Sequence, residues 1–458
     1  MGKTAAFLCG VILVVALLSG CTTPQSLEDR TEVGVTPKLS GARGPLTAAR
    51  SRAILDKLRA EAPDADVLKK HLAFEEAVSE TPLSTGNKVI LLRDGPATFA
   101  AIAALIRDAK NHINLEYFII EDVDLEGTKL SDLLIQKRQQ GVRVNLIYDS
   151  FGSSSTPDEM FARLRDAGVN MVAFNPVSAS LSGSSYSIND RDHRKMLIVD
   201  GTRAVTGGIN LSEVYSSNPL RRPKGADAPT AWRDTDIAIE GPAVAEMQRL
   251  FIQTWTSQKG AVIDQEGFFP PPVAADGQVV RVIGSAPAQD RPIYYITLLS
   301  AIRSAETRIF LTTGYFVPPR EALEDLIAAA RRGVDVQLLL PSQSDWGLAL
   351  HAGRSYYARL LEAGVKIYEL RDATLHSKTV VIDGVWSAIG SSNFDTRSAM
   401  FNDEIDLVIL GRETGEAMEA LFQEDVANAD RIDPKVWRGR SISQRAHEFF
   451  SRLWAYWL

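Results

Sequence analysis

Cysteine is almost absent from this 458-residue chain, which contains only Cys9 and Cys21. Two thiols near the N-terminus exclude a fold held together by several disulfides. The chain also lacks a cysteine cluster and a His-Glu-x-x-His sequence, which are common zinc-ligand patterns. Acidic residues outnumber basic ones, 57 to 50, and the resulting net charge of −7 argues against a nucleic-acid-binding groove.

The one long apolar run is at the N-terminus, MGKTAAFLCGVILVVALLSGC, where the apolar stretch after Lys3 is short for a membrane span. Its last four residues, Leu-Ser-Gly-Cys, resemble the lipobox of bacterial lipoprotein signals. The resemblance implies cleavage before Cys21 and attachment of a lipid to this residue. Cys9 would be removed with the signal, so the mature chain would contain no thiol pair. The alternative is an uncleaved signal anchor in which Cys21 is incidental.

An internal repeat occupies most of the remaining sequence. FAAIAALIRDAKNHINLEYFII (99–120) is similar to YYITLLSAIRSAETRIFLTTGYFV (294–317), and LLIQKRQQGVRVNLIYDS (133–150) is similar to DLIAAARRGVDVQLLLPS (325–342). Apolar runs such as VNLIYD alternate with amphipathic helical patterns. This alternation predicts an α/β fold of two homologous lobes, each with a largely parallel or mixed β-sheet flanked by helices.

Proline, glycine and composition shifts indicate the boundaries between these parts. The predicted segments are a signal peptide (1–20), a tether with N-terminal helices (21–86), a first lobe (87–263), a linker (264–278), a second lobe (279–430) and a C-terminal amphipathic segment (431–458).

Each copy of the repeat ends in the same motif, seen in DHRKMLIVDG (192–201) and LHSKTVVIDG (375–384). Both contain His-x-Lys, four mostly apolar residues and Asp-Gly. Because alternate residues of a strand share a face, the His and Lys of each motif are predicted to project side by side. These residues are His193, Lys195, His376 and Lys378.

The Asp-Gly pair that closes each motif is typical of a hairpin turn between two strands. Asp200 precedes Gly201 in the first motif, and Asp383 precedes Gly384 in the second. We therefore predict a structural rather than a chemical role for both Asp.

Downstream of each motif, a glycine-rich turn ends in asparagine: GGIN ends at Asn210, and GSSN ends at Asn393. Glycine permits close approach of the backbone to an anion, and the Asn amide can donate a hydrogen bond to it. An acidic residue follows in each copy, and alignment of the two copies pairs Asp234 with Glu404. A carboxylate in this place can hold a histidine ring in one tautomer.

Two such sets of His, Lys, Asn and carboxylate, brought face to face, are suited to phosphodiester chemistry at the lobe interface. One neutral imidazole can attack phosphorus while the other protonates the departing alkoxide. The Lys and Asn side chains can hold the phosphoryl oxygens, which carry the negative charge of the transition state. The ammonium groups also oppose binding of a cation, so we predict no metal and no cofactor.

The doubled H-x-K-x4-D motif followed by G-G/S-x-N is similar to that of the phospholipase D superfamily. Segments such as HINLEYFI, QGVRVNLIYDSFGS, HRKMLIVDG, WRDTDIAIEG and GSSNFDTRS resemble bacterial cardiolipin synthases, and the similarity covers roughly residues 85–458. The resemblance implies a phosphatidyltransferase that passes a phosphatidyl group to phosphatidylglycerol through a phosphohistidine. Phospholipids and a membrane are the implied partners, and no nucleic acid is expected.

The resemblance also implies a role for each matching position. The nucleophile would be His193, and the general acid and later base would be His376. The residues that would bind phosphate are Lys195, Lys378, Asn210 and Asn393, and those that would orient the histidines are Asp234 and Glu404.

The N-terminus departs from this family, because typical cardiolipin synthases open with two membrane-spanning helices. With a lipobox instead, the chain is predicted to be lipid-anchored and extracytoplasmic in a bacterial cell envelope. Thr22 stands where inner-membrane lipoproteins typically have Asp, which favours the outer membrane weakly.

Several alternatives stay open. Water as the acceptor would make the protein a hydrolytic phospholipase D; a nuclease is disfavoured by charge and anchoring, and a degenerate binding module by two intact motifs. The donor headgroup and oligomeric state are not given by the sequence.

Two segments also allow two interpretations each. NPLRRPKGADAP (218–229) either guides anionic lipid or forms a solvated loop. EFFSRLWAYWL at the C-terminus either lies in a lipid interface or packs on the second lobe.

The lipobox can be tested by replacing its cysteine. Cys21→Ser should abolish lipidation and leave the uncleaved precursor, because the only other thiol, Cys9, lies within the signal itself. Mass spectrometry of the membrane-associated protein measures both effects. A variant that is processed like the wild type would refute the lipoprotein interpretation.

Overall fold

The computed structural model describes residues 37–456, except 64, 80, 177–188, 218, 220–230 and 288–290. The predicted signal segment and its Cys21 lie outside the described residues, as does nearly all of the insertion at 218–229. In the described part of the chain, every helix is too short or too polar to span a bilayer.

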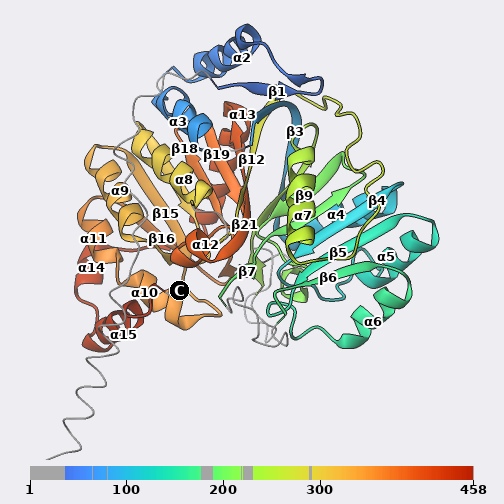
Figure 1. The fold of residues 1–458 in the computed structure, drawn as a ribbon. Coiled ribbons are helices and arrows are strands. Elements are labelled where there is room, and N and C mark those ends of the chain that lie inside the picture. Colours follow the sequence, from blue (N-terminus) through green and yellow to red (C-terminus); the bar gives the residue numbers. More distant parts are fainter. Residues whose placement is uncertain are drawn as a thin grey trace, which may run out of the picture. The chain divides into compact units, whose positions relative to one another are not determined.

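The first lobe is a mixed sheet with helices packed against it (Figure 1). Its strands run in the order β6-β5-β4-β8-β9-β11-β3, and the β4–β5 and β5–β6 pairs are parallel while the others are antiparallel. Its elements are β3 (Leu83–Arg93), α4 (Asp94–Asp108), β4 (His112–Tyr117), α5 (Leu130–Gln139), β5 (Arg143–Asp149), α6 (Asp158–Asp166), β6 (Asn170–Phe174), β7 (Arg191–Asp192), β8 (Lys195–Val199), β9 (Arg203–Gly207), β10 (Trp232–Arg233), β11 (Thr235–Glu240) and α7 (Val244–Ser257).

The second lobe repeats this topology, with strand order β16-β15-β13-β18-β19-β21-β12. As in the first lobe, the strand pairs nearest one edge of the sheet, β13–β15 and β15–β16, are parallel, and the other pairs are antiparallel. Its elements are β12 (Gln278–Ser285), α8 (Ile293–Ser304), β13 (Arg308–Thr312), β14 (Phe316–Val317), α9 (Arg320–Arg331), β15 (Asp335–Pro341), α10 (Gly347–Arg354), α11 (Tyr357–Glu362), β16 (Lys366–Leu370), β17 (Thr374–Leu375), β18 (Thr379–Ile382), β19 (Trp386–Gly390), β20 (Phe394–Asp395), α12 (Thr396–Met400), β21 (Asn402–Leu410), α13 (Arg412–Val426) and β22 (Ala429–Arg431).

This pair of lobes confirms the predicted α/β fold. Central strands such as β8, in which all five residues are buried, are covered on both faces, so their sequences are mostly apolar. The covering helices are amphipathic: α9 buries Leu323, Leu326 and Ile327 at helical spacing and turns charged residues to solvent.

The two lobes are joined through their sheets. Strand β12 pairs with β21 of its own lobe and also, antiparallel, with β3 of the first lobe. A shared core lies between the sheets, in which Met196 and Ile198 belong to the same apolar cluster as Ile389 and Leu407. Burial of this cluster fixes the lobes against one another, because separating them would expose its apolar surface to water.

The two Asp-Gly pairs form hairpin turns between β8 and β9 and between β18 and β19. Asp200 and Asp383 have φ values of 53° and 52°, and the following glycines are also left-handed, as in a type I′ turn. Each carboxylate accepts hydrogen bonds from successive backbone N–H groups of a neighbouring loop: Asp200 from residues 110–112 and Asp383 from residues 306–308.

Short elements flank the lobes at both ends. At the N-terminal side these are β1 (Leu39–Gly41), β2 (Gly44–Pro45), α2 (Ala48–Glu61) and α3 (Lys70–Val78), and α2 coincides with a stretch of helical spacing in the sequence. At the C-terminal side, α14 (Pro434–Arg438) and α15 (Ile442–Arg452) follow β22, and α15 packs on α10. Between α7 and β12, residues 258–277 form neither helix nor strand.

Candidate active site

A cavity of about 610 Å³ lies between the lobes and contains both motif histidines. Its walls come from several elements of each lobe, so neither lobe forms it alone. The lining residues are Phe118, Ile119, Phe151, Asn189, Arg191, His193, Asn210, Trp232, Tyr315, Asp345, Trp346, His376, Asn393, Asp395, Arg397, Ser398 and Asn402.

The structure corrects the predicted placement of the histidines on strands. His193 lies in the break between β7 and β8, and His376 lies between β17 and β18. At these breaks the backbone leaves its own sheet and bonds to the other lobe. The N–H of His193 donates to the carbonyl of Asp403, and the N–H of His376 donates to the carbonyl of Arg233. A period-two pattern does not reveal such a break, because extended backbone continues through it.

Each histidine is held by a carboxylate from the opposite lobe. Nδ1 of His193 lies 3.0 Å from Oε2 of Glu404, and Nδ1 of His376 lies 2.7 Å from Oδ2 of Asp234. The sequence predicted these two carboxylates as partners of the histidines; the structure adds that the partners are exchanged between lobes. An Nδ1 proton shared with a carboxylate leaves the Nε2 lone pair of the imidazole unprotonated.

The exchange extends to the backbone on either side of the site. Strand β7 pairs in parallel with β21, which carries Glu404, and β10 pairs in parallel with β17, next to His376. The two imidazole rings face the same cavity, with their centroids 6.5 Å apart. This separation is in the range that places one phosphate group between them.

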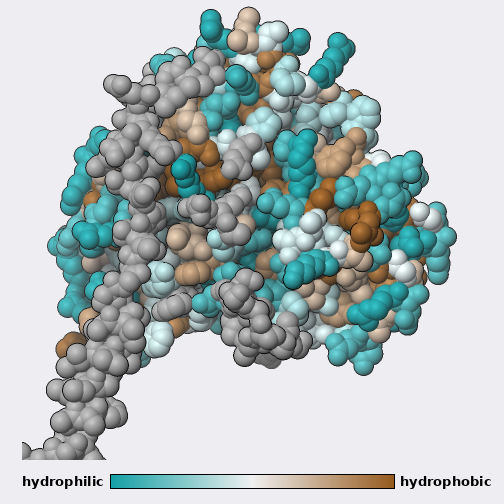
Figure 2. Space-filling view, in the orientation of Figure 1, coloured by the Kyte–Doolittle hydropathy of each residue, from teal (hydrophilic) through white to brown (hydrophobic). Residues whose placement is uncertain are grey.

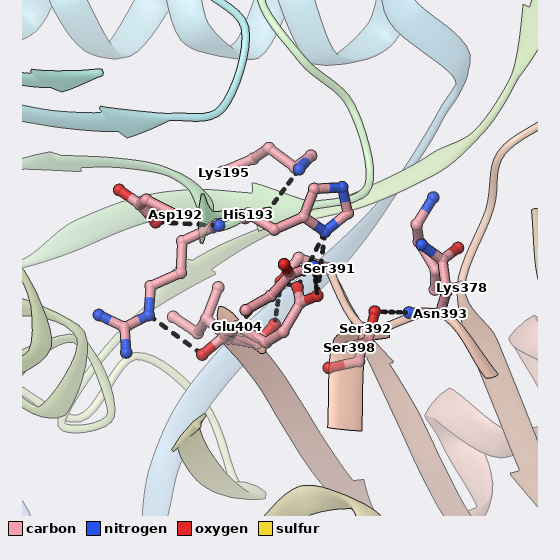
Figure 3. A network of polar contacts seen from close by, with 12 residues as sticks. Asp192, His193, Lys195, Lys378, Ser391, Ser392, Asn393, Ser398 and Glu404 are labelled. Carbon is pink, nitrogen blue, oxygen red and sulfur yellow. Dashed lines mark hydrogen bonds and ion pairs between the residues drawn. The ribbon is translucent and has the colours of Figure 1, made fainter. Parts of the chain in front are cut away.

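Glu404 is fixed by further hydrogen bonds. Its carboxylate accepts one from the hydroxyl of Ser391 at 2.5 Å and one from Nδ2 of Asn402 at 3.1 Å. Burial alone would raise the pKa of Glu404, but attraction to His193 and Lys195, together with hydrogen bonds from His193 and Ser391, lowers it to about 2. The carboxylate is therefore ionised at neutral pH, and Figure 3 shows it beneath the His193 ring.

Both motif lysines are buried beside the histidines. Nζ of Lys195 donates to the carbonyl of His193 at 2.5 Å, and Nζ of Lys378 donates to the carbonyl of His376. Burial lowers the pKa of Lys195 to about 7 and that of Lys378 to about 8. Burial outweighs the attraction of Glu404 and Asp234 for both ammonium groups, so this pair is poised to gain from a bound anion.

The histidines are neutral in the unliganded site. Burial lowers the pKa of His193 to about 4, and the nearby charges of Lys195 and Lys378 act in the same direction against Glu404. Burial and Lys378 likewise lower the pKa of His376 to about 4. A neutral imidazole is the form that can act as a nucleophile or a base.

The two predicted asparagines line the same cavity. The amide oxygen of Asn210 accepts a hydrogen bond from the N–H of Ile119 at 3.1 Å, which leaves its NH₂ group to donate. The backbone of Asn393 is held by Ser398, while its buried amide oxygen has no hydrogen-bond partner in the described residues. An orphaned polar atom at this position indicates that a ligand or solvent completes its hydrogen bonding.

Asp200 and Asp383, by contrast, lie at the far ends of β8 and β18 from Lys195 and Lys378. Their oxygens accept backbone hydrogen bonds there, and neither residue lines the cavity. Their placement agrees with a structural role, which remains a prediction.

Several residues of the site were not found from the sequence, and three of them contact the motif histidines or Glu404. The hydroxyl of Tyr215 lies 3.0 Å from Nδ1 of His376, and Trp232 packs on the same ring at 5.1 Å. Arg194, the variable residue of the first motif, donates to the carbonyls of Glu404 and Ser285 and so ties the lobes together. The sequence offered one indication of these residues, which is that all three lie close to motif residues along the chain.

Among the residues that the structure describes, no group of three or more His, Cys, Asp or Glu side chains is arranged to hold a metal ion. The site instead buries two lysine amines, whose charged forms a bound anion would favour, and presents two neutral imidazoles. This arrangement is suited to binding a phosphodiester and attacking its phosphorus.

Known proteins resemble this chain in sequence and in fold. The protein-family model described as "Cardiolipin synthase, PLD-like domain" matches residues 102–218 and 298–426. A cardiolipin synthase of Geobacillus sp. (strain WCH70) is 36% identical over 384 residues, covering 83% of this chain and 74% of that protein. A probable cardiolipin synthase of Bacillus subtilis, YwiE, is 29% identical over 429 residues, covering 92% and 83%.

A solved structure shares the fold at low sequence identity. The phosphatidylserine synthase of Haemophilus influenzae superposes with a TM-score of 0.62 at 14% identity, covering 85% of this chain and all of that one.

The lowered lysine pKa values predict a pH dependence of anion binding. A dialkyl phosphate, which keeps one negative charge throughout this range, should raise the pKa of Lys195 and Lys378 when it binds. Binding between pH 7 and 8 should then take up protons, and affinity should fall as the pH rises above about 7, by up to roughly tenfold per pH unit for each lysine that has lost its proton in the free protein. Calorimetry in buffers of different ionisation enthalpy measures the uptake. A heat of binding that is independent of buffer would contradict this prediction, and Lys195→Met should remove the step near pH 7.

Proposed function

The chain belongs to the cardiolipin synthase family of phospholipase D-like proteins, and on that premise we propose that it transfers a phosphatidyl group from one phospholipid to the glycerol headgroup of phosphatidylglycerol. The observation that carries the proposal is the pair of neutral histidines in one cavity, each aligned by a carboxylate of the other lobe. Two facing histidines can supply both a nucleophile and a proton donor to one phosphodiester.

In the first step, Nε2 of His193 attacks the phosphorus of the donor lipid. A P–N bond forms and the bond from phosphorus to the headgroup oxygen breaks, while His376 gives a proton to the departing alkoxide. The product is a phosphatidyl-histidine and a free headgroup alcohol. The assignment of His193 as the nucleophile follows the resemblance to the superfamily.

His376 must be protonated to act as the acid, although burial keeps it neutral in the unliganded site. The bound phosphodiester supplies the change, because its negative charge raises the pKa of a neighbouring imidazole. Lys195, Lys378, Asn210 and Asn393 then stabilise the phosphoryl oxygens as charge builds on them.

In the second step, the glycerol hydroxyl of phosphatidylglycerol is the acceptor. It gives its proton to His376, and its oxygen attacks phosphorus while the P–N bond to His193 breaks. The product carries two phosphatidyl groups on one glycerol. His193 returns to its neutral form, and His376 again holds the proton with which it began the first step.

Arg397 favours a phosphorylated acceptor over water. Its guanidinium lines the cavity and donates to the carbonyl of Asn189 at 3.2 Å, but no carboxylate of the described residues lies within ion-pair distance of it. The buried arginines Arg194 and Arg233, in contrast, each pair with carboxylates. A phosphate on the acceptor lipid would supply this missing counter-charge.

The proposed location is the extracytoplasmic side of a bacterial cell envelope, with a lipid on Cys21 and a weak preference for the outer membrane. This proposal rests on the signal sequence. The predicted partners are therefore phospholipids and the membrane that contains them.

The reaction is tested by offering competing substrates to the purified full-length protein. With labelled phosphatidylglycerol, cardiolipin and free glycerol should form in equal amounts, and labelled DNA should stay intact. Phosphatidic acid as the main product would instead identify a hydrolase, and cleavage of DNA would identify a nuclease. Separation of lipids by chromatography distinguishes these outcomes.

The roles of the two histidines are tested by trapping the intermediate. With His376→Ala, a nitrophenyl phosphodiester still has a leaving group that needs no proton, so a phospho-enzyme on His193 should accumulate and survive a denaturing quench at alkaline pH. With His193→Ala no adduct should form, and lipid transfer should fall by several orders of magnitude in both variants. Mass spectrometry locates the adduct. An adduct on His376 would reverse the roles, and none in either variant would exclude the covalent mechanism.

A further inference from the structure

Helix α15 packs with its polar side inward and its apolar side outward. Glu448 and Ser451 are 4% and 5% exposed, whereas Phe450 is 63% exposed. A helix of a water-soluble protein normally has the reverse arrangement. The outward apolar residues, here named the α15 face, are Phe449, Phe450, Leu453 and Trp454.

This orientation is fixed by specific contacts. Ser441 and Gln444 form a capping box at the start of the helix. Arg440 donates two hydrogen bonds, of 2.8 and 2.7 Å, to the carboxylate of the inward Glu448, and the helix packs on α10. The α15 face is therefore exposed because the polar side is held, and large exposed apolar patches of this kind mark interaction surfaces.

A basic cavity of about 370 Å³ opens beside the α15 face. Four arginines and a single carboxylate contribute charge to it, so it carries an excess of positive charge. The lining residues are Ser355, Arg438, Arg440, Arg445, Glu448, Phe449 and Arg452. Arginine side chains in a concave site are suited to binding a phosphate group.

The α15 face is linked to the catalytic cavity through neighbouring elements of the second lobe. Helix α10, on which α15 packs, begins beside Trp346, which lines the catalytic cavity and is 37% exposed. Beyond α15, Tyr456 contacts Phe401 at a ring distance of 5.8 Å, next to the cavity residue Asn402. Figure 1 shows α10, α12 and α15 on one side of the second lobe, and Figure 2 shows a mostly hydrophilic face with scattered apolar patches.

We propose that the α15 face docks on the surface of a bilayer containing anionic phospholipid, with the arginine cavity holding a lipid phosphate. Aromatic and aliphatic side chains beside arginines are the composition that binds at a membrane interface. A second copy of the chain fits less well, because a two-fold interface through this face would set its arginines against one another. Docking through α15 would hold the entrance of the catalytic cavity at the level of the lipid headgroups.

The proposal is tested with full-length protein on phosphatidylcholine vesicles prepared with and without phosphatidylglycerol, whose acyl chains carry bromine to quench tryptophan fluorescence. Trp454 should be quenched on vesicles with phosphatidylglycerol, so Trp454→Phe should lose that share of the quenching while its melting temperature stays unchanged. Arg445→Gln/Arg452→Gln should weaken the preference for phosphatidylglycerol vesicles by roughly tenfold or more.

Matched controls keep the outcome interpretable. Arg359→Gln/Arg371→Gln removes two arginines from elsewhere on the second lobe and should leave the lipid preference intact. Hydrolysis of a soluble phosphodiester should be equal in all these variants, which separates docking from catalysis. Equal quenching of wild type and Trp454→Phe on both vesicle types would overturn the proposal. So would a dimer in solution that Phe450→Ser disperses, because the α15 face would then be an interface between copies.

Discussion

Two buried imidazole–carboxylate pairs that cross between the lobes are the constraint on which this structure depends. Glu404 and Asp234 are fully buried anions, and a buried charge is tolerated only when it is paired and hydrogen-bonded. Their partners, His193 and His376, reach them only when both lobes are in place. The exchanged strands and the shared apolar core are thus requirements of the site as well as of the fold.

The same burial sets the chemistry of the cavity. Removal of water lowers the pKa of Lys195 and His193 and so keeps cationic charge scarce until an anion arrives. A phosphodiester, as in the proposed reaction, would favour the charged forms of these groups. Under the proposed mechanism, binding and activation would be the same electrostatic event, since the charge of the bound substrate would also favour the protonated form of His376 that serves as the acid.

Much of this arrangement was predictable from the sequence, because the internal repeat shows each strand, helix and motif in two independent copies. The α/β lobes, the motif residues and the hairpin position of Asp200 and Asp383 all follow from local patterns. The exchange of Asp234 and Glu404 between lobes does not, since a local pattern cannot say which of two equivalent histidines a carboxylate faces. Tyr215 and Arg194 were missed for the same reason: their roles come from partners far along the chain.

The crossed pairing has a consequence for how the two halves of the chain are allowed to differ. Two identical copies of one lobe, related by a two-fold axis, would reproduce every exchanged contact, but symmetry would then oblige both histidines to have the same surroundings. When both lobes belong to one polypeptide, their sequences can differ, and the two histidines can have different surroundings. Among the described residues, Tyr215, Trp232 and Tyr315 surround His376, whereas Phe118 packs on His193. A pseudo-symmetric site can thus give its two histidines different surroundings and different roles, whereas a symmetric site must give both the same surroundings.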